Sequence, residues 1–185
     1  MESDNTRIAV LYATAQGSSR DIAEYIASGL TARGARVELA EVEHAPELER
    51  FDAVVLGSAV HDRALLPEAD EFAHAHRDTL TTRPVWLFSV GLGPALRGPV
   101  GRLLGRTVPP AVAKVRDSIS PRDYRAFAGC FSSADVPLKT RVLYRLMGGG
   151  HYGDLRDWEA IAGWTEDIAD ELGLPRADSV SVPPS

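Results

Sequence analysis

The chain has 185 residues, a formal net charge of −6 and a pI near 5.4. This length suffices for one domain with its own core, and the acidic balance argues against general nucleic-acid binding, which needs a basic surface. We expect a cytoplasmic protein, because the start lacks a signal-peptide pattern and no run approaches the ~20 apolar residues of a membrane span. The single cysteine, Cys130, excludes an internal disulfide, and the apolar run AFAGCF predicts that it is a small buried core residue.

Strand-like and helix-like segments alternate along the chain. Strands are predicted where apolar residues run continuously, as in a sheet buried on both faces: 7–13, 36–41, 53–58, 85–90 and 124–131. Helices are predicted where apolar residues recur every three or four positions: 19–33, 68–80 and 157–172. This order predicts an α/β fold with a doubly wound, five-stranded parallel sheet and helices on both faces. We expect one domain over residues 1–174 and a flexible tail over 175–185, where the composition is typical of disorder.

The loop after the first predicted strand has the composition of a phosphate-binding loop. Its hydroxyls and backbone N–H groups can converge on one anion beside a helix N-terminus. It lacks the lysine of a nucleoside-triphosphate loop and the three glycines of a dinucleotide fingerprint, which leaves a monophosphate held by neutral donors. The alternative is a polar turn with Ser18 as the N-cap and Asp21 in the capping-box position. The loop consists of Thr14, Ala15, Gln16, Gly17, Ser18 and Ser19.

This loop matches the T-x-x-G-x-[ST] phosphate loop of flavodoxins, so the chain resembles a flavodoxin-fold FMN protein from its first strand onward. The resemblance implies that the loops after the third and fourth predicted strands line the flavin, in keeping with ligand binding at the carboxyl ends of parallel strands. Their small residues allow the backbone to approach the ring. Neither loop holds the Trp or Tyr with which many electron carriers cover the flavin, which suits a substrate that stacks on the ring. The implied residues are Ser58, Ala59, Val60, His61, Ser89, Val90, Gly91, Leu92 and Gly93.

The region after the fifth predicted strand separates this chain from a minimal flavodoxin. Residues 132–147 interleave basic and apolar side chains, and three glycines and the helix start DWE follow. Together with LYATAQGSSRDIAEYIASGL, VVLGSAVHD, FSVGL and FAGCF, this layout resembles the menaquinone-dependent protoporphyrinogen oxidase family of flavodoxin-fold proteins over nearly the whole chain. The resemblance implies that the flavin accepts hydride from a reduced tetrapyrrole and that the electrons pass to a quinone.

Other functions stay open at this point: an electron carrier that docks on partner proteins, an NAD(P)H-dependent quinone reductase, or a domain that no longer holds FMN. Electron carriers usually present an acidic rim, whereas residues 79–116 contain no Asp or Glu, which favours an anionic substrate or lipid. The cations of this stretch are Arg83, Arg97, Arg102, Arg106, Lys114 and Arg116.

A second group of cations, Lys139, Arg141 and Arg145, alternates with apolar residues. We interpret it either as a helix that packs on the domain or as a surface for propionates or for peripheral contact with an anionic membrane. The oligomeric state is left open, and an oligomer is compatible with the sequence. No side chain is identified as a catalytic acid or base. The loop histidines His61 and His151, each in a loop with an Asp, are interpreted as solvated rather than catalytic. No metal site is predicted, because His74 and His76 point to different faces of a helix.

Overall fold

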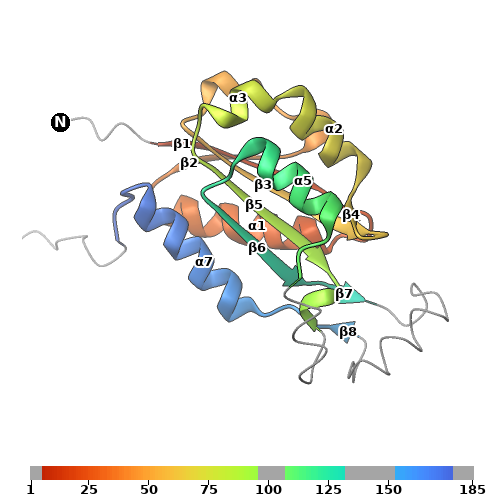
Figure 1. Ribbon diagram of the computed structural model, residues 1–185. Helices are drawn as coiled ribbons and strands as arrows, with labels where there is room; N and C mark the ends of the chain where they lie inside the picture. The colour runs from red at the N-terminus through yellow and green to blue at the C-terminus, as the bar shows by residue number, and fades with distance from the viewer. Residues whose placement is uncertain (1–5, 96–106, 132–152, 177–185) are drawn as a thin grey trace, which may run out of the picture.

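The computed structural model, which describes residues 6–95, 107–131 and 153–176, has a central parallel sheet between two layers of helices (Figure 1). The strand order is β2-β1-β3-β5-β6. The strands are β1 (Arg7–Ala13), β2 (Arg36–Glu41), β3 (Ala53–His61), β5 (Val85–Gly91) and β6 (Asp123–Ala128). β4 (Ala64–Leu65) pairs antiparallel with β3, and β7 (Cys130–Phe131) pairs antiparallel with β8 (Gly153–Asp154) outside the main sheet. The predicted α/β fold is confirmed.

Helices cover both faces of the sheet. One face carries α1 (Ser18–Ala32) and α7 (Trp158–Glu171). The other carries α2 (Pro67–Ala75), α3 (Arg77–Thr81) and α5 (Pro110–Ile119). Three short 3₁₀ turns complete the described elements: η1 (Val42–His44), η2 (Leu48–Arg50) and η3 (Gly93–Ala95). None of the helices in the described ranges is long and apolar enough to cross a membrane.

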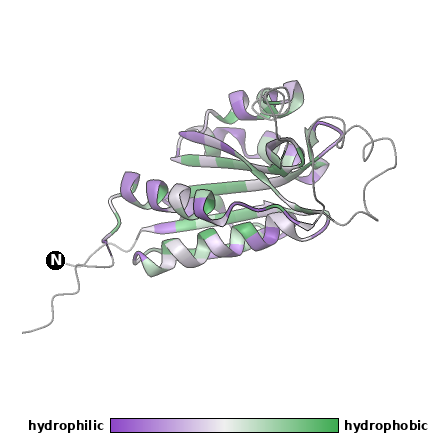
Figure 2. Cartoon of the chain, turned by 90° about the horizontal axis from the view of Figure 1, so that it is seen from below, coloured by the Kyte–Doolittle hydropathy of each residue, from purple (hydrophilic) through white to green (hydrophobic). Residues whose placement is uncertain are grey.

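The core consists of two apolar layers, one on each face of the sheet. Because successive side chains of a strand point to opposite faces, Ile8 and Val10 of β1 pack toward α1 and α7, whereas Ala9 and Leu11 pack toward the other helices. Figure 2 shows the strands as largely hydrophobic bands between the helix layers. Burial on both faces explains why β1 has the predicted bounds, because its apolar run ends where the strand ends. β2 also has the predicted bounds, although it is an edge strand without a fully buried residue.

Several predicted bounds change in the structure. β3 continues to His61 and turns back into β4, and the predicted helix 68–80 is divided at His76, where φ is −104° and the ring packs on Phe72. The predicted strand 124–131 ends at Ala128, and the chain then leaves the sheet into β7. The expectation that Cys130 is buried is wrong: Cys130 is exposed, because β7 lies outside the main sheet.

A buried cation ties α1 to α7 at the end of the molecule remote from β7. Arg33 is 4% exposed and forms ion pairs with Glu166 and Asp170, the latter at 2.7 Å. It also donates to the carbonyls of Leu174 and Pro175. Hydrogen bonds from Arg33, and then from Arg176, hold the pKa of Asp170 below its usual value. These contacts fix the chain up to residue 175. Residues 177–185 of the predicted tail lie outside the described ranges.

Candidate functional site

The register of the sheet brings the three predicted loops to one edge. Ala13 at the end of β1 lies opposite Ser58 of β3, and Ser58 lies opposite Ser89 of β5. Gly91 at the end of β5 lies opposite Ala128 of β6. The carboxyl ends of β1, β3 and β5 therefore meet, and the loops that follow them adjoin one another (Figure 1). This is the edge at which open α/β sheets bind ligands.

The β1–α1 loop, residues 14–19, is a tight turn built around Gly17. The φ of Gly17 is +90°, which glycine adopts without strain. Its N–H donates to Thr14 Oγ1 at 2.9 Å, and its carbonyl accepts from the Asp21 N–H at 3.0 Å. A Cβ at Gly17 would meet no atom within 4 Å. Glycine is therefore required here by the backbone conformation and not by crowding from the protein. Ala15 and Gln16 are exposed.

The interpretation of this loop as a capped turn is wrong for Ser18. Gly17 occupies the N-cap position and no side chain caps the helix. Ser18 Oγ instead accepts from the Cys130 N–H at 2.9 Å and donates to the Cys130 carbonyl at 3.3 Å. Asp21, placed by the sequence in a capping box, pairs with Arg156. No local pattern could indicate these contacts, because they join residues more than 100 positions apart.

The hydroxyl of Ser19 lacks a hydrogen-bond partner within the described ranges. Its side chain is 0% exposed, and its Oγ has no hydrogen-bond partner among the described residues. A buried hydroxyl without a partner costs about 1–3 kcal/mol. It lies in the first turn of α1, where the backbone N–H groups also lack intrahelical partners and the helix dipole favours an anion. The arrangement fits a phosphate, which would accept from the hydroxyl and from the N–H groups together.

In the loop after β3, the hydroxyl of Ser58 stabilises the fold through hydrogen bonds to the backbone. It accepts from the Leu66 N–H at 3.0 Å and donates to the Ala59 carbonyl at 2.8 Å. Ala59 and Val60 are half-buried, and His61 has a side chain that is 78% exposed. Among the predicted residues of this loop, the backbone and the side chains after Ser58 are the parts that can face a ligand.

The loop after β5 likewise contains residues that stabilise the fold and residues that can face a ligand. Ser89 Oγ lies 2.6 Å from the Tyr124 hydroxyl, and burial raises the pKa of Tyr124. Val90 is part of the core. Gly91 is buried against Val60: a Cβ at Gly91 would lie 3.4 Å from the Val60 Cβ, so a larger residue would press on the neighbouring strand. Leu92 and Gly93 are half-buried and lead into η3.

An arginine that the sequence analysis missed connects this edge to β8. The Arg156 side chain is 13% exposed, and it contacts Asp21 at 2.6 Å and Asp154 at 2.7 Å. Its guanidinium stacks on Trp158 at 4.6 Å. Hydrogen bonding from Arg156 lowers the pKa of Asp154. With the Ser18–Cys130 bonds, these contacts attach both strands of the β7–β8 ribbon to the start of α1.

Several predicted residues lie outside the described ranges: Arg97, Arg102, Arg106, Lys139, Arg141, Arg145 and His151. Lys114 and Arg116 lie on α5, where Arg116 pairs with Asp117 at 2.8 Å. Within the part of the chain that the structure describes, no group of three or more His, Cys, Asp or Glu side chains is arranged to hold a metal ion.

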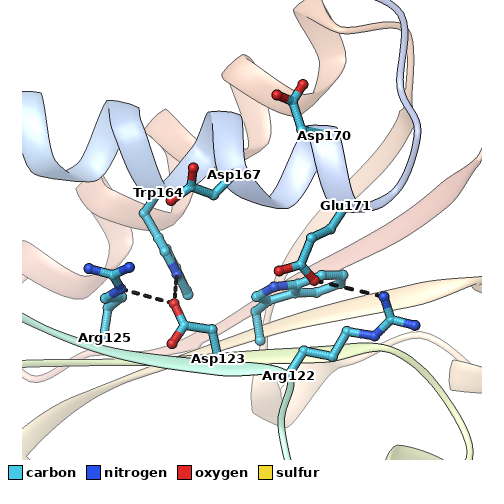
Figure 3. Close-up of a pocket in the computed structure, with 8 residues that line it drawn as sticks. Arg122, Asp123, Arg125, Trp164, Asp167, Asp170 and Glu171 are labelled. Atoms are coloured by element: carbon cyan, nitrogen blue, oxygen red, sulfur yellow. Dashed lines mark hydrogen bonds and ion pairs between the residues drawn. The ribbon is translucent and has the colours of Figure 1, made fainter.

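An open groove of about 560 Å³ lies between β6 and α7 (Figure 3). Trp86 and Asp123, which stand at the beginnings of β5 and β6, help to line it, so the groove is at the amino edge of the sheet. Asp123 accepts from Trp164 Nε1 at 2.8 Å and from Arg125 Nε at 2.9 Å. Burial raises the pKa of Asp123, but these hydrogen bonds outweigh it and the pKa lies below its usual value.

Comparison with known proteins points to the same family as the fold. The model of the flavodoxin domain family matches residues 9–147. A protein of Escherichia coli strain K12, "Protoporphyrinogen IX dehydrogenase [quinone]", is 26% identical over 175 residues, which cover 86% of this chain and 93% of that protein. Among solved structures, a flavodoxin from the domain Archaea aligns with a TM-score of 0.56 at 16% identity, covering 91% of this chain and 99% of that one. Oxidised flavodoxin 1 of Bacillus cereus aligns with a TM-score of 0.56 at 15% identity, covering 89% and 98%.

Proposed function

Because the chain belongs to the flavodoxin domain family, whose cofactor is FMN, we propose that it is an FMN-dependent oxidoreductase that oxidises a reduced tetrapyrrole and reduces a quinone. The relative named for protoporphyrinogen IX and quinone supports this choice, since the likeness extends over 93% of that protein. The structural observation that carries the proposal is the buried, partnerless Ser19 hydroxyl beside the first turn of α1.

The residues at the carboxyl edge divide into those that would hold FMN and those that support them. The β1–α1 loop would bind the phosphate through its backbone N–H groups and Ser19 Oγ. Ala59, Val60, Leu92 and their neighbours would face the flavin, while Ser58, Ser89 and Val90 hold the strands in place. When bound, FMN supplies two-electron redox chemistry at its ring.

The chain contributes shape rather than acid–base catalysis. Ala59, Val60 and Leu92 have small or aliphatic side chains, and neither loop holds a Trp or Tyr to cover the flavin face. Gly91 lets Val60 pack close beside β5 and keeps the edge narrow. A flat substrate can then lie against the ring, and the apolar walls exclude water from it.

The test is anaerobic reduction of the FMN-loaded protein. We expect protoporphyrinogen IX to bleach the flavin absorbance, NAD(P)H to do so at a far lower rate, and menaquinone to restore it. Rapid bleaching by NAD(P)H with none by protoporphyrinogen would assign a quinone reductase. A flavin that neither donor reduces, but that a protein redox partner does, would assign an electron carrier. No flavin spectrum after reconstitution with excess FMN would contradict cofactor binding itself.

A further inference from the structure

β3 runs past the sheet and folds back on itself. Its ladder with β5 ends at Ala59, and Val60 and His61 pair instead with β4. Asp62 and Arg63 form the two-residue turn between the strands. The β3–β4 hairpin therefore projects from the carboxyl edge of the sheet, the edge at which the β1–α1 loop lies (Figure 1).

The base of this hairpin is fixed to the domain. Leu66 donates its N–H to Ser58 Oγ at 3.0 Å and to the Ala59 carbonyl at 3.2 Å. Leu65 is 5% exposed and belongs to the core beneath α2. A hairpin with a pinned base and a two-residue turn holds the side chains at its tip in a defined place.

The turn adopts a strained conformation for the residues that form it. The φ of Asp62 is 47° and the φ of Arg63 is 65°, so both lie in the left-handed region. Hairpin turns with two positive φ values favour Asn or Asp first and Gly second. Asp62 conforms to this preference and Arg63 opposes it, because a long side chain in this region costs free energy that glycine avoids.

Nothing in the described protein offsets this strain. The Arg63 side chain is exposed and forms no hydrogen bond or ion pair with any described residue. The paired hairpin fixes the backbone position of Arg63, while its unpaired guanidinium is free to contact a ligand at the edge where the ligand-binding loops meet. Its planar fork of donors matches a carboxylate in geometry and charge.

We propose that Arg63 is a specificity-determining residue that binds a carboxylate of the substrate as the substrate lies against the flavin. This inference rests on the proposed function, in which the substrate is a tetrapyrrole that bears carboxylates. Asp62 beside it has a side chain that is 92% exposed and negatively charged, so it opposes the same carboxylate. The two neighbours thus act with opposite sign, and each serves as a control for the other.

The experiment compares FMN-loaded Arg63→Gly, Arg63→Lys and Asp62→Asn with the wild type. The probes are protoporphyrin IX, a dicarboxylate, and its dimethyl ester, with binding followed by quenching of the flavin fluorescence. Arg63→Gly should raise Tm by about 2 °C through relief of strain and weaken dicarboxylate binding about fivefold without affecting the ester. Arg63→Lys should keep most of the affinity without the gain in Tm. Asp62→Asn should leave Tm unchanged and tighten dicarboxylate binding.

Three outcomes would overturn the assignment of Arg63: an unchanged ratio of dicarboxylate to ester affinity in Arg63→Gly, a fall in its Tm, or a loss of FMN affinity, which would assign Arg63 to the cofactor. The proposed function fails separately. If the wild type binds the dicarboxylate through Arg63 but does not oxidise reduced porphyrin, the binding role stands and the reaction is wrong. If porphyrinogen is oxidised equally well by Arg63→Gly, only the role of Arg63 is wrong.

Discussion

The two edges of the sheet use their polar groups in opposite ways. At the amino edge, Asp123 binds both Trp164 and Arg125, and Arg122 pairs with Glu171 beside it. At the carboxyl edge, Ser19 has a buried hydroxyl without a partner among the described residues, and Arg63 stands unpaired on a strained turn. The groove of about 560 Å³ lies at the edge where, among the described residues, no buried side-chain polar atom lacks a partner. A hollow is therefore a weaker guide to a binding site in this protein than donors left without partners.

The sharpest test of the carboxyl edge is Gly17→Ala. A Cβ at Gly17 meets open space, so the substitution acts through its φ of +90° alone. We expect a displaced β1–α1 loop to lose two charge-assisted hydrogen bonds of about 1.5 kcal/mol each, which weakens FMN binding roughly a hundredfold. Fluorescence titration of the apoprotein with FMN measures this.

Gly163→Ala is the matched control, because a Cβ at Gly163 also meets nothing within 4 Å but the residue lies inside α7 at an ordinary φ. It should raise stability by about 1 kcal/mol, as expected for alanine in a helix, and leave FMN binding unchanged. Equal loss of FMN in both variants would show that the backbone of Gly17 is not what matters.

At the other end of the molecule, Arg33→Met should affect stability and not FMN. The substitution keeps the apolar length of the side chain but removes the Arg33 hydrogen bonds to Glu166, Asp170 and two carbonyls. We expect Tm to fall by roughly 6 °C with the FMN dissociation constant unchanged. Arg176→Met is the control: Arg176 pairs with the same Asp170 at 2.9 Å, but its side chain is 77% exposed, so Tm should change by about 1 °C or less. A large loss of FMN affinity in Arg33→Met would show that the amino edge of the sheet does affect binding at the carboxyl edge.

Ser19→Ala should change stability and affinity in opposite directions. Removal of a buried hydroxyl that lacks a partner should raise the Tm of the apoprotein by about 2 °C. The same change should weaken FMN binding about tenfold, since the phosphate loses one charge-assisted hydrogen bond. Ser118→Ala is the comparison, because Ser118 Oγ donates to the Val115 carbonyl on α5, remote from the loop. A lower apoprotein Tm in Ser19→Ala would mean that the hydroxyl does have a partner in the fold.

The smallest effect concerns pH and Asp123. Its pKa is lower in the folded protein than in the unfolded chain. Its contribution to stability is therefore fully present above pH about 4 and is lost as pH falls through the lowered pKa. The Tm difference between wild type and Asp123→Asn should shrink over that range, while the spectrum of bound FMN at neutral pH stays the same. A difference that persists to the lowest pH at which the protein folds would contradict the assignment of this carboxylate.

The sequence predicted the strands of the main sheet better than the turns and short elements that follow them. β1 could be bounded because its continuous apolar run ends where burial on both faces ends. α5 was missed although Val112, Val115 and Ile119 carry the buried helical spacing, since two prolines and several polar residues obscure it. The β3–β4 turn gave no signal, because Asp62-Arg63 lacks the glycine that marks such hairpins.

The sequence predicts which residues form the candidate site, but it does not distinguish the roles of their hydroxyls. Nothing in the sequence distinguishes Ser19, Ser58 and Ser89 from one another. In the structure Ser58 is satisfied by Leu66, eight positions on, and Ser89 by Tyr124, 35 positions on, which leaves Ser19 as the partnerless one among them. Such distinctions depend on tertiary contacts, which local patterns do not contain.

The attachment of the β7–β8 ribbon to α1 has a consequence for how this protein can be altered. Ser18 holds Cys130 at one end and Arg156 holds Asp154 at the other, so the chain between them departs from and returns to the same place on the helix. The positions of Cys130 and Asp154 beside the β1–α1 loop therefore depend on Ser18, Asp21 and Arg156, so a substitution at any of these three residues should displace the ribbon and the start of α1 together.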